Sequence, residues 1–549
     1  MKTWLNKGEH WVWYSAAAAA ASVVLVFGLL LMIAFRGLSH FWPHAVYEFQ
    51  IQPTPSSEVQ ILQGEIHNTR FRETRDPQNP GFVLREPQIL IKTGNRDLYS
   101  FDFRWVDEAH IVGQTWNKAQ GISVIERYAS GNMYGYIQAF KNDQGEITEL
   151  QQVYKAINAA IKEGNKIRTK IRHLERTVIG GINHDLQTLR YDRRKLEMRD
   201  RLTPQLEAEM EAKRQAMHEK FGVLQLQLDG YYRELNALGS VVVRVGTDRD
   251  VEVNVSQFVR FWQPNEMHLG NKLGYFFGSI GSFLTDDPRE SNTEGGVFPA
   301  IVGTLTMVIL MTLFVMPMGV VAAIYMREYA KEGRLLRLIR ISINNLAGVP
   351  SIVFGIFGLG FFVYILGFSV DQMFYSHALP NPTFGTPGLL WASLTMALLT
   401  LPVVIVATDE GLSRIPRALR EGGLALGATK AEVIMRIVLP MTTPAIMTGL
   451  ILAVARAAGE VAPLMLVGVV KSVTELPVNA NAPFIHLDQK FMHLGFHIYD
   501  VGFQSPNVEA AQPLVYATSL LLVVLIVSLN LAAIVIRNRL REKYKSLDN

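Results

Sequence analysis

The sequence predicts an α-helical membrane protein with six transmembrane helices and a large water-exposed domain between the first and the second. Hydrophobic residues make up 49% of the 549 residues, whereas charged residues make up only 19%, and the mean hydropathy is +0.15. The apolar residues are gathered in runs of about 20 residues or more, the length that crosses the hydrocarbon core of a bilayer. One long polar stretch, 37–296, separates the first run from the others.

The composition excludes several classes of function. There is no cysteine, so disulfides, thiol catalysis and thiolate metal sites are excluded. The chain has no GxxxxGK[ST] phosphate-binding loop. The formal net charge of +4 is too small to indicate a nucleic-acid partner. We therefore expect no cofactor, no metal and no ATP hydrolysis in this chain.

The first apolar run, 15–36, predicts a permanent membrane anchor. Trp11, Trp13 and Tyr14 precede it and Trp42 follows it, as interfacial aromatic residues do. A secretory signal peptide is the alternative, but the apolar core is too long for one and no small-residue cleavage site follows. Residues 1–14 then form a short cytoplasmic N-terminus.

The polar stretch 37–296 predicts a β domain with a helical hairpin inserted into it. Short runs of β-forming residues broken by Gly, Asn and Pro occupy about 59–140 and return at 241–253. Between them, at about 147–238, apolar residues recur at helical spacing with coiled-coil character. The basic run 190–201 could suggest nucleic acid or acidic lipid, but its interspersed acidic residues favour a solvated helix face.

The remaining 297–540 carries five further apolar segments, which we expect to cross the membrane at about 297–325, 341–368, 389–408, 444–470 and 512–536. Lysine and arginine are concentrated at 327–340, at 409–440 and in the tail, whereas 369–388 has none. The positive-inside rule places those three basic segments, including the tail 541–549, in the cytoplasm. Both termini are then cytoplasmic, and 37–296 lies outside, in a periplasm-like space.

The segment 421–440 is polar, helix-forming and located between two apolar spans. We expect Glu421 to open a helix, because a carboxylate is favoured in the first turn. Gly427 interrupts the pattern and Pro440 ends the apolar run, which predicts two short helices around a turn. Such a segment can lie at the membrane surface and offer an apolar face to a partner's groove. An ordinary connecting loop is the alternative.

The segment 444–470 is a span that contains two charges. Thr443 can cap its helix and Pro444 can begin it. A stripe of small residues allows a second helix to approach closely; its members are Ala445, Gly449, Ala453 and Ala457. Arg456 and Glu460 lie four residues apart on one face, and each charge at mid-bilayer costs about 2.5–3.5 kcal/mol. We expect them to line an ion path; an internal ion pair that locks two helices is the alternative.

Pro350 and Ser351 indicate a second candidate position on this path. Ser351 could cap a half-helix whose amide groups face an anion, because helix N-termini bind anions. Close packing by the small residues around it is an equally good interpretation.

Several motifs resemble those of ABC importer permeases. Glu421, Leu426, Gly427 and Ala428, followed by Leu439-Pro440, are similar to the coupling-loop motif of these permeases, although Gly422 and Gly423 stand where two alanines are usual. The stretch 456–464, Arg-Ala-Ala-Gly-Glu-Val-Ala-Pro-Leu, resembles the signature of phosphate importer permeases of the A type (PstA). Two further stretches, 323–330 and 346–355, fit the same family, and the resemblance covers about 290–540.

The resemblance implies a type I importer fold and one permease subunit of an ATP-driven phosphate importer in the bacterial inner membrane. The implied partners are a second permease subunit of the C type, an ATP-binding subunit dimer that hydrolyses ATP, and a periplasmic phosphate-binding protein. The coupling residues would contact the ATPase, while Arg456, Glu460 and Ser351 would line the phosphate path. Two alternatives stay open: another oxyanion such as sulfate or molybdate, and a membrane sensor or scaffold that uses the coiled coil.

Overall fold

The computed structural model describes residues 9–52, 58–75, 83–99, 101–114, 116–143, 145–246, 249–473, 475–479, 482–505 and 508–545. The chain divides into two compact units. The membrane unit comprises Met1–His40, Val297–Asn479 and Pro483–Asn549, and the inserted unit comprises Phe41–Gly296 with Ala480–Ala482.

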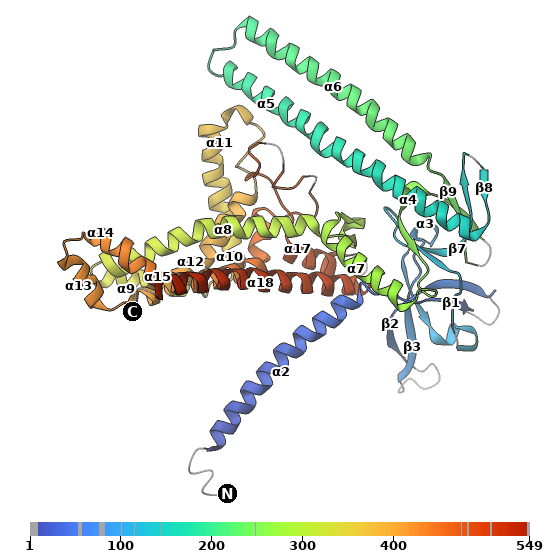
Figure 1. Cartoon of the computed structure of the whole chain (residues 1–549), viewed down its shortest axis with the longest axis horizontal. Helices are drawn as coiled ribbons and strands as arrows, with labels where there is room; N and C mark the ends of the chain where they lie inside the picture. Colours follow the sequence, from blue (N-terminus) through green and yellow to red (C-terminus); the bar gives the residue numbers. More distant parts are fainter. Residues whose placement is uncertain are drawn as a thin grey trace. The chain divides into compact units, whose positions relative to one another are not determined.

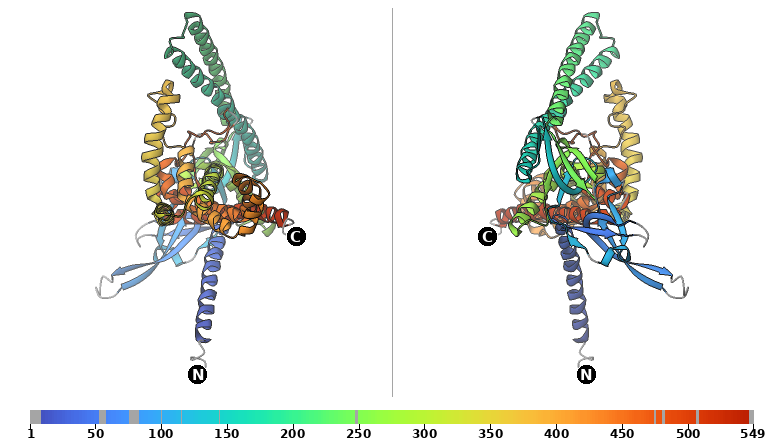
Figure 2. Two further views of the ribbon diagram at one scale, coloured as in Figure 1. Left: turned by 90° about the vertical axis from the view of Figure 1, so that its left-hand side faces the viewer. Right: turned by 90° about the vertical axis from the view of Figure 1, so that its right-hand side faces the viewer.

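The inserted unit is built on two antiparallel sheets. The first has the strand order β4-β3-β2-β1-β5 and the second the order β10-β9-β7-β6-β11, with β8 paired to β7. The strands are β1 Val46–Ile51, β2 Gln60–Arg75, β3 Val83–Lys92, β4 Phe103–Asp107, β5 Asn117–Lys118, β6 Ser123–Arg127, β7 Met133–Asn142, β8 Gly145–Ile147, β9 Ser240–Val245, β10 Arg249–Asn254 and β11 Phe258–Trp262. Figure 2 shows β2 and β3 as a long pair that reaches away from the other strands.

A helical hairpin leaves the second sheet after β8 and returns to it at β9. It consists of α4 Leu150–His173, a π-helical segment η3 Leu174–Ile179, α5 Gly180–Glu197 and α6 Pro204–Asn236, within the predicted 147–238. Thr203 caps α6 by accepting a hydrogen bond from the Leu206 amide. Near the sheet, Ile167 and Ile171 of α4 pack with Leu235 of α6, whereas α5 and the rest of α6 are largely exposed (Figure 1).

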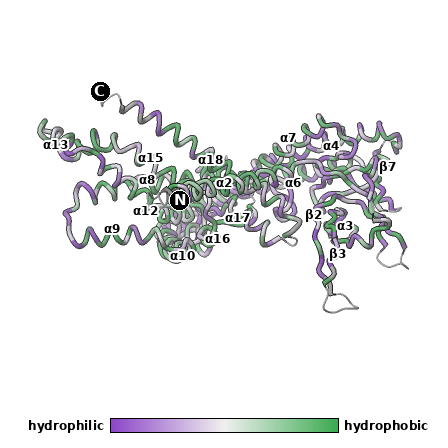
Figure 3. Tube along the Cα trace, turned by 90° about the horizontal axis from the view of Figure 1, so that it is seen from below, coloured by the Kyte–Doolittle hydropathy of each residue, from purple (hydrophilic) through white to green (hydrophobic). Residues whose placement is uncertain are grey.

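In the membrane unit, six helices among the described residues are long and apolar enough to cross a bilayer, as the sequence predicts. They are α2 Glu9–Ser39; α8 Phe298–Ile324 with η6 Tyr325–Tyr329; α10 Ser351–Phe357 with η7 Gly358–Gly367 and α11 Phe368–Phe374; α12 Leu389–Ser413; α14 Lys430–Val433 with η9 Ile434–Val438 and α15 Leu439–Gly459; and α18 Val508–Lys545. In Figure 3, α18 changes from mostly hydrophobic to largely hydrophilic near the C-terminus.

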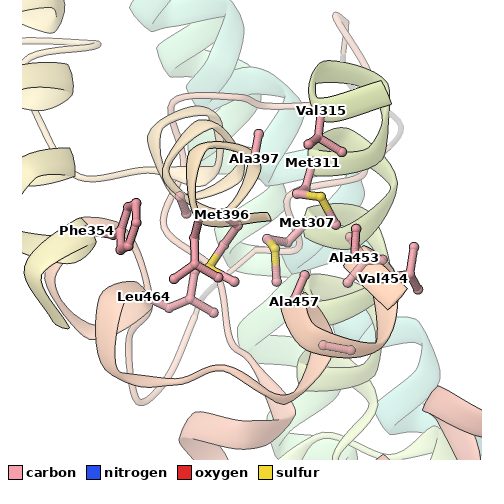
Figure 4. Close-up of a cluster of buried hydrophobic side chains, with 14 of the residues drawn as sticks. Met307, Met311, Val315, Phe354, Met396, Ala397, Ala453, Val454, Ala457 and Leu464 are labelled. Carbon is pink, nitrogen blue, oxygen red and sulfur yellow. The ribbon is translucent and has the colours of Figure 1, made fainter. Parts of the chain in front are cut away.

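The core of the membrane unit lies where α8, α12 and α15 meet. Met307, Met311 and Met396 are buried there, together with Ala453 and Ala457 of α15 (Figure 4). The predicted stripe of small residues forms part of this contact: a Cβ added to Gly449 would lie 2.7 Å from the Ala407 Cβ of α12. Small side chains therefore set the close approach of α12 and α15.

Two predicted helix boundaries around Pro440 are wrong. Pro440 does not end the run, because it lies at the start of α15, directly after the π-helical segment η9. The hydrogen-bond pattern changes at that junction, so the missing proline N–H is tolerated. Thr443 and Pro444 do not begin a helix either, since both lie inside α15 and the Thr443 hydroxyl donates to the Leu439 carbonyl.

The expected span at 341–368 is also displaced. A separate helix, α9 Arg334–Leu346, ends before Pro350, and the candidate span begins at Ser351 and continues to Phe374. Proline restricts the residue before it to extended conformations, which ends α9 and lets the chain begin a new helix. The remaining helices of the membrane unit are α13 Arg417–Ala425, α16 Ala462–Val467 and α17 Leu494–Tyr499.

Candidate functional site

Two short helices with a tight turn between them form the candidate coupling surface. Gly427 has φ +86°, a conformation that favours glycine, and separates α13 from α14. Thr429 and Glu432 form a reciprocal capping box at the start of α14. Glu421 does not open a helix as expected: α13 already begins at Arg417, because Pro416 provides the extended residue before it.

The predicted coupling residues do not all lie together. Leu426, at the turn, is 91% exposed, and Glu421 and Gly427 are exposed as well. Ala428 is half-buried against the apolar cluster beneath α13. Leu439 and Pro440 are half-buried at the start of α15, in the same candidate span as α14. The exposed part of the motif thus comprises Glu421 of α13 and the turn, and its last two residues belong to the span.

The face of α13 that carries Gly423 is packed against the helix that follows. Gly423 is buried, and a Cβ added there would lie 2.9 Å from Val433 Cγ2 and 3.1 Å from Ile437 Cδ1, whereas a Cβ added to Gly422 would meet open space. Gly423 therefore lets α13 approach the helix that follows it, and Gly422 has no such role.

The coupling helices are attached to the candidate span formed by α8 and η6, through residues whose role the sequence did not reveal. Arg420 Nη2 lies 3.0 Å from Glu328 Oε1, and its guanidinium also donates to the Leu412 carbonyl at 2.8 Å. Lys430 donates to the backbone carbonyl of Glu328 and lies 4.8 Å from the centre of the Tyr329 ring. Glu328 and Tyr329, at the end of η6, therefore hold both coupling helices.

The candidate charged pair lies at a helix end. Arg456 Nε is 3.5 Å from Glu460 Oε1, with the two side chains 32% and 25% exposed. The expected continuous span through both residues is wrong, because α15 ends at Gly459 and Glu460 is extended, with φ −82° and ψ 136°. Arg456 is therefore in the last turn, where a cation is favoured by the helix dipole.

Ser351 is the first helical residue of α10 rather than its cap. Pro350 occupies the capping position and has no side-chain hydrogen bond. The structure nevertheless brings the two motif stretches together, since a Cβ added to Gly355 would lie 2.7 Å from the Pro463 Cα. This contact places α10 against α16, which follows Glu460 after Val461.

Helix α17 packs against the turn after Glu460, and buried polar residues lie in and beside this helix. A Cβ added to Gly495 of α17 would lie 2.6 Å from Val461 Cγ2. Burial lowers the pKa of His493, and of His497 within α17, to about 4. Asp500 is buried and lies 3.2 Å from the Lys471 ammonium. Among the described residues, no group of three or more metal-ligating side chains could hold an ion.

The chain is similar to known transport proteins over its second half. Residues 315–543 match the family "Binding-protein-dependent transport system inner membrane component". The "Phosphate transport system permease protein PstA 1" of Mycobacterium tuberculosis (strain CDC 1551 / Oshkosh) is 34% identical over 245 residues, which are 44% of this chain and 71% of that protein. The PstA of Mycobacterium leprae (strain TN) is 34% identical over 239 residues, which are 43% of this chain and 69% of that protein.

Solved structures are similar over a comparable part. One match is to a chain of the MetNI methionine ABC transporter in an inward-facing conformation. The match covers 45% of this chain and 94% of the MetNI chain, at 18% identity and a TM-score of 0.32. A second match is to a chain of a bacterial ABC transporter involved in the import of alginate. It covers 46% of this chain and 80% of the transporter chain, at 17% identity and a TM-score of 0.32.

The relatives are permease subunits, which are not themselves enzymes, and the ATPase of such transporters is a separate subunit. The matched region contains five of the six candidate spans in whole or in part, together with the coupling helices and the charged pair. This chain belongs to the PstA family of phosphate ABC importer permease subunits.

Proposed function

We propose that this chain, with a second permease subunit of the C type, forms the translocation path of an ATP-driven phosphate importer that works by alternating access. The observation that carries the proposal is the coupling turn. Leu426 is 91% exposed at its tip, while Arg420 and Lys430 attach the helices on either side of it to Glu328 and Tyr329. An apolar tip fits a groove on a partner, and rigid attachment would transmit movement of that partner to a span.

The charge distribution supports one orientation. The basic segments 327–340, 409–440 and 537–545 would lie in the cytoplasm, where a dimer of ATP-binding subunits reaches Glu421, Leu426, Gly427 and Ala428. Leu439 and Pro440 would pass the displacement into α15. Residues 37–296 would then lie in the periplasm, on the side from which a phosphate-binding protein delivers its anion.

The charged pair provides a candidate gate for the anion. The Arg456 guanidinium is a planar fork suited to phosphate oxygens. Glu460 would hold Arg456 when the path is empty and release it when phosphate arrives; the 3.5 Å separation and partial exposure of both side chains are compatible with exchange of partners. Ser351, on the helix that packs against the same motif, would lie on the path as well.

The test is ATP hydrolysis by the reconstituted complex with its binding protein. Phosphate should stimulate hydrolysis several-fold, and sulfate or molybdate should not. Stimulation by sulfate or molybdate instead would assign a different oxyanion. A complex that assembles but responds to no anion would contradict the transport role and favour a membrane sensor or scaffold that uses the exposed helical hairpin.

A further inference from the structure

The helix α7 Leu269–Thr285, in the inserted unit, has one packed face and one uncovered face. Its packed face is aromatic. Phe283 is buried, and the Tyr275 ring centre lies 4.8 Å from that of Trp262 in β11. Ser279, also buried, accepts a hydrogen bond from the Arg260 guanidinium at 3.0 Å. These contacts fix the rotation of α7 about its own axis.

The uncovered face is apolar. Leu269 is 74% exposed, Phe277 is 65% exposed and Leu273 is also exposed. At helical spacing these side chains fall on one side of α7. Four glycines continue the same exposed side, and a Cβ added to any of them would meet no atom within 4 Å; they are Gly270, Gly274, Gly278 and Gly281. No acidic residue occurs in α7.

The position of α7 in the chain indicates what covers this face. The candidate span α2 ends at Ser39, and the next aromatic residues, Phe41 and Trp42, pack directly on α7. Phe41 lies 5.2 Å from Phe283, and Trp42 lies 6.1 Å from Phe276, between ring centres. The next span, α8, begins at Phe298, shortly after α7 ends. Short connections therefore join α7 to α8, and join its aromatic partners Phe41 and Trp42 to α2.

We infer that α7 is an interfacial helix whose exposed face, Leu269, Leu273 and Phe277, inserts into the bilayer surface on the side where α2 ends. Residues that directly follow a span are at the headgroup level, and Trp42 and Tyr275 are residues enriched there. A helix with an aromatic packed face and an apolar open face suits that boundary. The glycines let lipid chains or headgroups come close to the backbone. The inserted unit is thereby fixed to the membrane by α7 in addition to its chain connections to α2 and α8.

The natural absence of cysteine makes a direct test simple. Phe277→Cys and, independently, Leu273→Cys are introduced into the full chain and labelled with a nitroxide. Gln215→Cys, on the exposed surface of α6, is the matched control. The assembled transporter is reconstituted in vesicles of phosphatidylethanolamine and phosphatidylglycerol, and collision rates with molecular oxygen and with a water-soluble nickel chelate are measured. Size-exclusion elution confirms that each labelled variant assembles.

At positions 277 and 273 the oxygen rate should exceed the nickel rate several-fold, and at position 215 the nickel rate should be the larger. The same pattern should hold when this chain is reconstituted without the second permease subunit. The inference is overturned if both α7 positions are as accessible to nickel as position 215. It is also overturned if they are shielded from both reagents, or become shielded only with the second subunit, since a protein partner would then cover α7.

Discussion

Arg420 of α13 and Glu328 of η6, at the end of the candidate span that begins with α8, form an ion pair, with 3.0 Å between Nη2 and Oε1. Both side chains are largely buried, at 21% and 11% exposure. The same guanidinium donates to the Leu412 and Ile415 carbonyls of the preceding segment. One arginine thus joins the coupling helix to two spans.

Breaking this ion pair should uncouple ATP hydrolysis from transport. Arg420→Ala leaves Glu328 without its cation, and Glu328→Gln leaves Arg420 without its carboxylate. We expect either change to lower phosphate taken up per ATP hydrolysed. The double variant should show a coupling free energy of about 0.5–3 kcal/mol in thermal unfolding. Arg417→Ala, an exposed residue of the same helix, is the control. Strictly additive single-variant effects would contradict a functional pair.

The two adjacent glycines of α13 should respond oppositely to alanine. Gly422→Ala places a Cβ in open space inside a helix, so it should stabilise α13 by about 0.5–1 kcal/mol. Gly423→Ala places a Cβ 2.9 Å from Val433, so it should destabilise the coupling helices by about 1–3 kcal/mol, as overpacking does. Thermal unfolding of the purified complex measures both. Equal effects at the two positions would show that α13 is not packed as described.

The exposed turn should control association with the ATPase. Leu426→Asp replaces an apolar tip with a charge and should weaken co-purification of the ATP-binding subunits at least tenfold, whereas Leu426→Met should leave it nearly unchanged. Gly427→Ala forces a left-handed conformation on alanine, at a cost of about 1 kcal/mol, and should have an intermediate effect. Normal co-purification of the Leu426→Asp variant would remove the turn from the interface.

The charged pair should be needed for uptake and not for folding. Arg456→Lys keeps the charge but loses the planar fork, and Glu460→Gln removes the counter-charge. We expect phosphate uptake to fall about tenfold or more in each, with normal protein level. Lys471→Gln, in the segment after α16, is the comparison variant: it tests whether the loss of another positive charge lowers phosphate uptake as much. Uptake at the normal rate in both pair variants would leave only a structural role for the pair.

Two buried carboxyl groups of the inserted unit should give stability changes of opposite sign. Burial raises the pKa of Glu294, so its proton is held more tightly in the folded state. Its contribution to stability is therefore fully present below the unfolded pKa and is lost as the pH rises through the raised folded value. Glu294→Gln should therefore stabilise the inserted unit at pH 7, and the gain should disappear below about pH 4, where the unfolded carboxyl is also protonated.

The matched variant is Glu126→Gln. Burial opposes ionisation of Glu126, but Arg260 and Arg289 outweigh it and lower its pKa. Its contribution to stability is therefore present above the unfolded pKa and is lost as the pH falls through the lowered folded value. Removing the carboxylate at pH 7 leaves Arg260 and Arg289, both partly buried, without this charged acceptor, which should cost about 1–3 kcal/mol. The free energy of unfolding of the inserted unit is measured by denaturing the purified chain at several pH values. It should increase in Glu294→Gln and decrease in Glu126→Gln at pH 7.

Features that depend on contiguous residues could be predicted from the sequence. Apolar runs of sufficient length predict the six spans, and glycine at position 427 predicts a turn that the structure confirms, because φ is +86° there. The spacing of small residues predicts the close contact of α15, and the heptad-like period predicts the helical hairpin. The family signature at 456–464 is likewise a pattern of contiguous residues, which is why it indicates the family independently of how the chain folds.

The helix ends and the long-range pairs required the tertiary structure. Proline usually ends a helix, yet Pro440 follows a π-helical segment in which the hydrogen bonds are already shifted, and Val433 and Val438 at the two ends of that segment are buried in one apolar cluster. Arg456 and Glu460 have helical spacing, but the chain turns at Glu460, where α16 packs against α10. The pairing of Arg420 with Glu328 joins residues far apart in the chain. Periodicity reports which face of a segment is apolar, whereas the partner of that face is decided by the packing of the whole unit.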